Sequence, residues 1–296
     1  MKILNFGSLN LDNVYTVDHF IRPGETMSSE KLEIFCGGKG LNQSIALARA
    51  GAEVYHAGSV GILDGERLLD IMKASGVDIS LVKKTDGVSG HAVIQVDRTG
   101  QNCILLFGGA NKEITKEQIE ETLDHFDAGD VLLMQNEISE PAYMIQRAAE
   151  KGMQIYLNPS PVTAELLTLP LDKINCFILN EIEAADLCRE EVSGKKVSED
   201  KLPELLYRKY PGAAILLTLG EKGSIYYDGK HRLEQAAYFA DVVDTTGAGD
   251  TFTGYFIAAI SGGSDIEPAL KRAAKAASIA VSRKGAAVSI PWEKEV

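Results

Sequence analysis

Four continuous apolar runs in the second half of the chain constrain its fold more than any other feature. They cover residues 130–134, 153–157, 176–179 and 214–217, and helical segments such as 142–151 and 202–210 lie between them. Strands without polar alternation are buried on both faces, as in a parallel sheet covered by helices. With a further short strand at residues 2–6, the alternation predicts an α/β fold whose mostly parallel central sheet is flanked by helices.

Polar residues gather where the apolar runs end. Glu137, Asn158, Asn180 and Glu183 follow three of these runs. Each of them alone is more typical of a loop or a helix cap. Several strand ends meeting at one edge of a parallel sheet, however, define a single ligand cleft, because open α/β sheets bind ligands at the carboxyl ends of their strands.

Residues 10–36 and 88–107 differ from the rest of the chain. Residues 91–96 and 102–107 have the composition of strands, and the turn sequence at 97–100 joins them into a hairpin without a helix. Together with the extended part of 13–36, the hairpin predicts a small β-sheet lid beside Asn10 and Asp12, two short polar residues that are also common in loops. The predicted body is 1–9, 37–87 and 108–296, and the edges of the lid favour a homodimer through it.

A glycine-rich turn at residues 244–250 opens a helix whose apolar positions recur up to residue 260. Gly247 and Gly249 allow backbone N–H groups to turn inward, and the positive end of the helix adds to them, which makes a cradle for an anion. Asp250 at its rim can cap the helix, or it can serve as a base for a hydroxyl that attacks a phosphoryl group. The residues alone leave both interpretations open.

A second glycine-rich segment, residues 37–42, opens another helix. Leu41, Ile45 and Ala48 form its buried stripe, and Lys39 and Asn42 lie one turn apart. The segment is no Walker-type phosphate loop, because no Ser or Thr follows the lysine.

Composition excludes two classes of partner. The formal net charge of -12 repels polyanions, so we expect no nucleic acid. The sequence has no long apolar span and no leader at its amino terminus, so we expect no membrane association. The four cysteines are scattered without paired spacing, which is typical of a cytoplasmic protein.

Segments distributed over the chain resemble the ribokinase-like (phosphofructokinase B type) carbohydrate kinases, in particular the members that act on ribose. The resemblance rests on residues 37–42, 158–161, 180–183, 218–220, 244–250 and 282–292. It implies an ATP-dependent kinase that transfers the γ-phosphoryl group to the primary hydroxyl of a sugar, with D-ribose giving D-ribose 5-phosphate. The cofactors that it implies are ATP, Mg²⁺ and K⁺.

The resemblance also implies roles for individual residues. Asp250 is the expected general base, and Gly247, Ala248 and Gly249 form the expected anion hole. The expected sugar-binding residues are Asn10, Asp12, Gly38, Lys39, Asn42, Glu137 and Asp250. The expected nucleotide-binding residues are Asn180, Thr218, Gly220, Gly223 and Gly249. Asn180 and Glu183 are expected to organise Mg²⁺ through water. The expected K⁺ site comprises Asp244, Thr246, Ala280, Arg283, Gly285 and Ser289.

Other functions stay open at this point. A kinase for 2-deoxyribose or fructose, or a nucleoside kinase of the same fold, explains most of these features. A non-catalytic sensor of sugar or nucleotide explains fewer, because it does not require Asp250.

Overall fold

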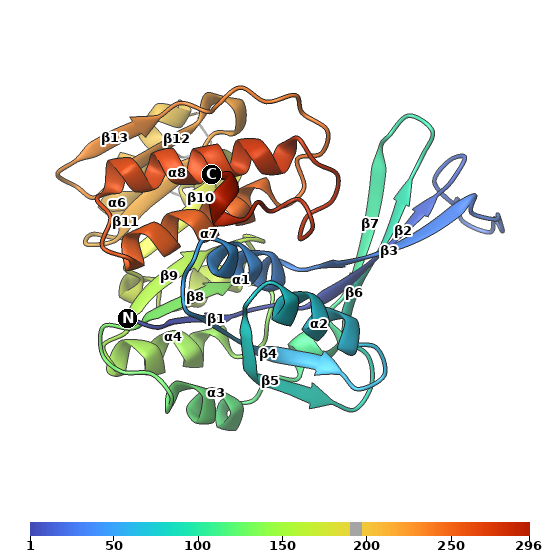
Figure 1. Cartoon of the computed structure of the whole chain (residues 1–296), viewed down its shortest axis with the longest axis horizontal. Helices are drawn as coiled ribbons and strands as arrows, with labels where there is room; N and C mark the ends of the chain where they lie inside the picture. The colour runs from blue at the N-terminus through green and yellow to red at the C-terminus, as the bar shows by residue number, and fades with distance from the viewer. Residues whose placement is uncertain (190–196) are drawn as a thin grey trace.

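A large sheet forms the centre of the computed structural model, which describes residues 1–189 and 197–296 (Figure 1). Its strands are β1 (Ile3–Phe6), β4 (Val54–Gly61), β5 (Asp78–Thr85), β8 (Val131–Gln135), β9 (Gln154–Asn158), β10 (Cys176–Asn180), β11 (Ala214–Thr218), β12 (Ser224–Tyr227) and β13 (Arg232–Gln235). Their order is β13-β12-β11-β10-β9-β8-β1-β4-β5. Neighbours from β11 to β5 pair in parallel, and β12 and β13 add an antiparallel edge. The predicted α/β fold with a mostly parallel sheet is confirmed.

Helices cover both faces of this sheet and bury two separate cores. One core includes α1 (Lys39–Arg49), α2 (Glu66–Ala74), α7 (Ala248–Ser261) and α8 (Ile266–Val281). The other includes α3 (Lys116–Leu123), α4 (Pro141–Glu150), α5 (Glu181–Leu187) and α6 (Leu202–Lys209). In β1, Ile3 contributes to the first core and its neighbour Leu4 to the second. A strand placed in this way has no solvent-facing side, which is why three of the four residues of β1 are apolar.

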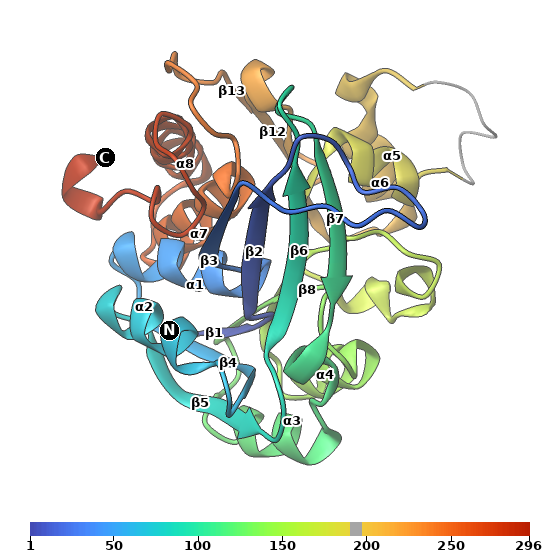
Figure 2. The same ribbon diagram turned by 90° about the vertical axis from the view of Figure 1, so that its right-hand side faces the viewer.

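A second, smaller sheet projects from the body (Figure 1), and its four strands lie side by side in Figure 2. It contains β3 (Lys31–Gly37), β2 (Asn10–Thr16), β6 (Gly90–Val96) and β7 (Asn102–Phe107), in the order β3-β2-β6-β7. The expectation of a small separate sheet is therefore confirmed. Asn10 and Asp12 lie in β2, so the interpretation of these two residues as ordinary loop residues is wrong.

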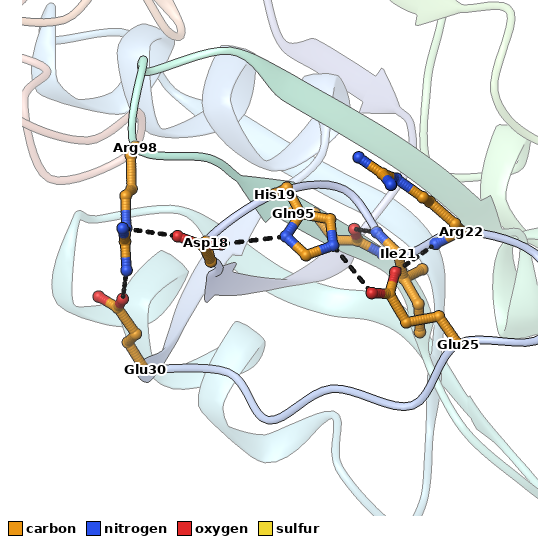
Figure 3. A network of polar contacts seen from close by, with 8 residues as sticks. All are labelled: Asp18, His19, Ile21, Arg22, Glu25, Glu30, Gln95 and Arg98. Carbon is orange, nitrogen blue, oxygen red and sulfur yellow. Dashed lines mark hydrogen bonds and ion pairs between the residues drawn. The ribbon is translucent and has the colours of Figure 1, made fainter.

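The far end of the small sheet is held by a network of charged residues (Figure 3). Arg98, in the turn after β6, forms ion pairs with Asp18 at 2.7 Å and with Glu30 at 3.4 Å. His19 contacts both Asp18 and Glu25, and these hydrogen bonds raise its pKa. Because these groups are exposed, the network orders the loop after β2 without adding much stability.

Among residues 1–189 and 197–296, no helix combines the length and the apolar character that crossing a bilayer requires.

Candidate active site

The start of α7 forms one side of the site. Gly247, its N-terminal cap, has a φ of 75°, a left-handed conformation that favours glycine. A β-carbon added to Gly249 would meet no atom within 4 Å, so open space adjoins the helix start at this position. The first N–H groups of a helix have no partner within it. An anion that entered this space would therefore find unpaired donors and the positive end of the helix dipole.

Asp250 is buried in the first turn of α7, with 9% of its surface exposed. Its two carboxylate oxygens accept hydrogen bonds from different side chains of α1: Oδ2 from Asn42 Nδ2 at 2.9 Å, and Oδ1 from Gln43 Nε2 at 2.8 Å. The cap position of α7 belongs to Gly247 and has no side-chain hydrogen bond. The interpretation of Asp250 as a mere helix cap is therefore wrong.

Close packing brings α1 and α7 together around this carboxylate. A β-carbon on Gly254 would lie 2.3 Å from the β-carbon of Ala46, so only glycine fits at this crossing. Likewise, a β-carbon on Gly40 would lie 2.4 Å from the carbonyl carbon of Gly7, at the end of β1. The glycines thus let the first turn of α1 approach both the sheet and α7.

Two charged residues, Lys39 and Glu137, lie close to Asp250. Glu137 Oε2 accepts hydrogen bonds from the Ser8 hydroxyl and, at 3.3 Å, from the Lys39 backbone N–H. Burial raises the pKa of Glu137, although Lys39 opposes the shift. Burial disfavours the charge of Lys39, but Asp250, Glu137 and Glu183 outweigh it and raise the lysine pKa. A cation is thus held among carboxylates at the mouth of the anion cradle.

Asp12 and Asn10 approach the same place from β2. A β-carbon on Gly37 would lie 2.1 Å from Asp12 Oδ2, and one on Gly38 would lie 3.1 Å from the Asn10 backbone nitrogen. Burial, and secondarily the charge of Glu137, raises the pKa of Asp12 to about 6. The structure therefore brings the expected sugar-binding residues of β2, of the 37–42 segment and of the loop after β8 to one location.

The expected nucleotide-binding residues follow neighbouring strands. Asn180 and Thr218 are paired in register at the ends of β10 and β11. Gly220 and Gly223, in the turn after β11, have φ angles of 56° and 100°. A β-carbon on Gly223 would lie 2.0 Å from the Gln235 carbonyl oxygen, so this turn requires glycine.

Asn180 and Glu183 use their side chains to cap α5. Asn180 Oδ1 accepts hydrogen bonds from the Ile182 and Glu183 N–H groups, both at 2.9 Å, and Glu183 Oε2 accepts one from the Asn180 N–H at 3.0 Å. The second Glu183 oxygen has no part in this capping box. Within the described part of the chain, no group of three His, Cys, Asp or Glu residues could hold a metal ion directly. The side-chain oxygens of Asn180 and Glu183 fit a magnesium ion that keeps its water shell.

The two segments expected to hold potassium lie side by side. The Val243 and Asp244 N–H groups both bond to the Val281 carbonyl, at 2.8 and 3.1 Å. Asp244 Oδ2 accepts from the Gly285 N–H at 2.9 Å, and Oδ1 accepts from the Thr246 N–H at 2.9 Å and from its hydroxyl at 2.6 Å. Asp244 thus joins the cradle to the loop after α8. Backbone carbonyl oxygens, such as those of this loop, are suitable ligands for a large monovalent cation. The remaining expected residues of the set lie in or beside that loop: Ala280, Arg283 and Ser289.

Four further residues, not predicted as site residues from the sequence, complete the site: Ser8, Gln43, Asn111 and Gln135. Asn111 Nδ2 donates to Asn10 Oδ1 at 2.8 Å, and its own oxygen accepts from the Leu9 N–H at 3.0 Å. Gln43 directly follows Asn42, and its position in the same motif was the only available signal. The contacts of Asn111 and Gln135 span more than 90 residues and leave no local pattern.

Known proteins resemble this chain in both sequence and fold. Residues 1–293 match the model of the pfkB family carbohydrate kinases. The chain is 34% identical to a ribokinase of Staphylococcus aureus, with 100% of this chain and 98% of that protein covered. The solved structure of a Cryptococcus neoformans ribokinase in complex with ADP matches with a TM-score of 0.88 and 33% identity, over 99% of this chain and 98% of that one.

The structure of an Arabidopsis thaliana ribokinase complexed with ribose and ATP matches with a TM-score of 0.85 and 30% identity, over 99% of this chain and 96% of that one. A family match over nearly the whole chain, with relatives above 30% identity at almost full coverage, is specific. The chain belongs to the pfkB family of carbohydrate kinases.

Proposed function

We propose that this protein is an ATP-dependent ribokinase, which transfers the γ-phosphoryl group of ATP to the primary hydroxyl of D-ribose and forms D-ribose 5-phosphate. The observation that supports this most is the environment of Asp250. Its buried carboxylate is held by Asn42 and Gln43 rather than by its own helix, and open space adjoins Gly249 one residue away. The relatives that bind ribose, ATP or ADP supply the identities of the two substrates.

In the proposed mechanism, Asp250 accepts the proton of the primary hydroxyl as its oxygen attacks the γ-phosphorus. The bond between that phosphorus and the bridging oxygen breaks as the new bond forms, and ADP leaves. Negative charge on the transferred group is stabilised by the N–H groups of Gly247, Ala248 and Gly249 and by the start of the α7 dipole. Lys39, whose charge the surrounding carboxylates favour, adds a cation close to the incoming phosphoryl group.

The sugar would be recognised by hydroxyl-binding groups around the mouth of this cradle. Asn42 Nδ2 donates to Asp250, and Asn42 Oδ1 is buried without a hydrogen-bond partner. A buried acceptor of this kind is costly unless a ligand pairs with it, and a sugar hydroxyl can do so. We assign Asn10, Asp12, Gly38 and Glu137 to the same role, and their closeness to the 37–42 segment supports this assignment.

For the nucleotide we propose Asn180, Thr218, Gly220, Gly223 and Gly249. Mg²⁺, when bound, would neutralise phosphate charge, and Glu183 would orient its water shell with the carboxylate oxygen that the capping box leaves open. K⁺ would be held by oxygens of the 244–246 and 280–289 segments, where Asp244 ties the two together.

We further propose that the small sheet closes over the sugar as a lid and pairs with a second copy. Its outer strand β7 exposes Ile104, Leu105, Leu106 and Phe107, each by more than half. An apolar edge strand of this length is a surface that proteins normally cover.

A cytoplasmic location is consistent with Cys36 and Cys176, which are buried thiols.

A coupled assay of ADP release tests the substrate. Initial rates with D-ribose, 2-deoxyribose, fructose and adenosine should give the highest kcat/KM for D-ribose, by at least about a hundredfold over 2-deoxyribose, because a buried hydrogen-bonding set rejects an analogue that leaves it unpaired. Equal kcat/KM for ribose and 2-deoxyribose would contradict the assignment to ribose. A preference for adenosine would support a nucleoside kinase instead, and no ADP release with any of the four would support a sensor.

A further inference from the structure

A continuous chain of buried amides leads from the Asp250 carboxylate into the sheet. Gln43 donates to Asp250 Oδ1, and Gln43 Oε1 accepts from Gln135 Nε2 at 2.7 Å. Gln135 Nε2 donates its other hydrogen to Asn5 Oδ1 at 3.0 Å. Asn5 Nδ2 donates in turn to the Gly40 carbonyl at 2.8 Å and to the Ser44 hydroxyl at 2.9 Å. The side chains that lead from Asp250 into the sheet are almost completely buried. Each of these residues is at most 1% exposed: Asn5, Gln43, Ser44, His56 and Gln135.

The groups at the two ends of this hydrogen-bond chain determine which way each side-chain amide in it is oriented. The Gly40 carbonyl can only accept, so Asn5 must present its NH₂ group there and its oxygen to Gln135. Gln135 must then use its NH₂ group toward both Asn5 and Gln43, which leaves the NH₂ group of Gln43 facing Asp250. A flipped Gln43 would set its oxygen against a carboxylate oxygen and its NH₂ group against another NH₂ group. Gln43 is therefore held in the one orientation that donates to Asp250.

The far end of the chain is also defined. The Ser44 hydroxyl accepts from Asn5 Nδ2 and also forms a hydrogen bond with His56 Nδ1, at 2.7 Å. Gln135 Oε1 faces the end of β1, where a β-carbon on Gly7 would lie 2.3 Å from it. Only glycine at this position leaves room for the Gln135 amide. The sequence thus keeps the space that this arrangement needs.

We propose that Gln43 is a positioning residue for the proposed base: it fixes one Asp250 oxygen so that the carboxylate presents a defined lone pair to the sugar hydroxyl, and Gln135 acts through Gln43 by fixing its amide. This inference rests on the proposed function, in which Asp250 accepts the proton. Asn42 holds the other oxygen but is also a proposed sugar-binding residue, whereas Gln43 is 1% exposed and its side chain bonds to Asp250 and Gln135. A base held on both oxygens cannot rotate away from its substrate, and small misplacements of a catalytic group cost large factors in rate.

The first test replaces Gln43 by methionine, which keeps the length of the side chain and removes the donor. Gln43→Met should lower kcat by at least about tenfold and change KM for ATP little, since the donor acts on the base and not on the nucleotide. The matched control is Gln118→Met. Gln118 is also a buried glutamine, 3% exposed, with its NH₂ group on the Gly58 carbonyl at 2.9 Å, but it has no contact with Asp250. Equal losses of kcat in both variants would overturn the inference, because general destabilisation would then explain them.

The second test replaces Gln43 by glutamate, whose shape is nearly the same. Two carboxylates 2.8 Å apart would share a proton, which hinders the ionisation that the base requires. The other charged groups close to Asp250 are Lys39 and Glu137, and they are the same in both proteins. The acid limb of kcat against pH should therefore move upward by at least about one pH unit in Gln43→Glu. An unmoved limb overturns the inference, and this outcome can be read even if Gln43→Met does not fold.

The third test is a double-mutant cycle. Because Gln135 acts through Gln43, Gln135→Met should lower kcat in the wild-type background and have almost no further effect on kcat in Gln43→Met. Independent, multiplying losses would overturn the role given to Gln135. The variant Asp250→Ala separates the two levels of the argument. Full turnover in Asp250→Ala would contradict the proposed role of Asp250 as the base. Loss of turnover in that variant, together with a normal kcat in Gln43→Met, would contradict only the positioning role of Gln43.

Discussion

At the scale of single residues, the site depends on a carboxylate whose contacts are not those of a helix cap. Asp250 bonds to Asn42 and Gln43 on α1, 208 and 207 residues away in the chain. Asp250→Ala should lower kcat by at least about a hundredfold, the lower size of a general-base contribution, while nucleotide affinity stays close to wild type. Steady-state kinetics and nucleotide titration measure the two quantities. Asp250→Asn is the matched control for folding, since it keeps the size of the side chain but cannot accept the proton.

Asp12 allows a prediction about stability and pH. Its pKa is raised from 3.8 to about 6 by burial and then by Glu137, so the folded state binds a proton more tightly than the unfolded state. This contribution to the free energy of unfolding is complete below pH 3.8 and is lost as the pH rises through about 6. Asp12→Asn should therefore stabilise the ligand-free protein by up to about 3 kcal/mol at pH 7.5 and by little at pH 4. Urea unfolding at the two pH values measures this, and an equal effect at both would contradict the assignment. Ribose affinity should fall in the same variant.

At the scale of elements, the cradle depends on a neighbouring loop. Asp244 joins the residues before α7 to the loop after α8 through Thr246 and Gly285. A cation that binds the ordered arrangement better than the disordered one shifts the population toward it, and so improves the placement of the cradle amides. Replacing sodium by potassium at constant ionic strength should raise kcat, and Asp244→Ala should abolish the difference. Identical rates of the unmodified protein in the two salts would count against a potassium site.

The small sheet makes a second prediction at this scale. Because β7 exposes four consecutive apolar residues on an edge, we expect a second copy to cover them. Leu106→Glu should convert a dimer into a monomer at micromolar concentration, as measured by sedimentation or light scattering. Leu167→Glu is the control, since Leu167 is also an exposed leucine, at 44%, but lies in the body between β9 and β10. A monomeric wild-type protein, or equal dissociation by both variants, would contradict pairing through the small sheet.

At the scale of the whole molecule, a buried histidine couples stability to pH. His56 lies in β4 with no exposed surface, and burial lowers its pKa from 6.5 to about 3. Its contribution to stability is complete above pH 6.5 and is lost as the pH falls toward 3, because the unfolded chain then binds a proton that the folded protein does not. His56→Gln should flatten the fall in the free energy of unfolding between pH 6.5 and 5 by about 2 kcal/mol. Denaturant unfolding at these two pH values measures the slope, and an unchanged slope would sink the prediction.

The sequence by itself determined the features of this protein that repeat locally. Strands buried on both faces are continuously apolar, so β8, β9, β10 and β11 could be recognised without knowledge of their neighbours. Glycines at helix starts and the turn between β6 and β7 are also local signals. The mostly parallel sheet and the small second sheet followed from them. By contrast, β5, whose residues are all half-buried or exposed, and the short antiparallel strands β12 and β13 were not recognised from such a pattern.

Only the tertiary structure decided how the site is held together. The sequence left open whether Asp250 caps its helix, because that depends on two side chains more than 200 residues away. Ser8, Asn111 and Gln135 were not predicted as site residues for the same reason: their partners lie more than 100 residues away in the chain. A hydrogen bond between distant residues imposes no periodicity on either segment, so neither one predicts it. The residue types needed for the chemistry were therefore readable from the chain, whereas their orientation required the fold that brings α1, α7 and the ends of β1 and β8 together.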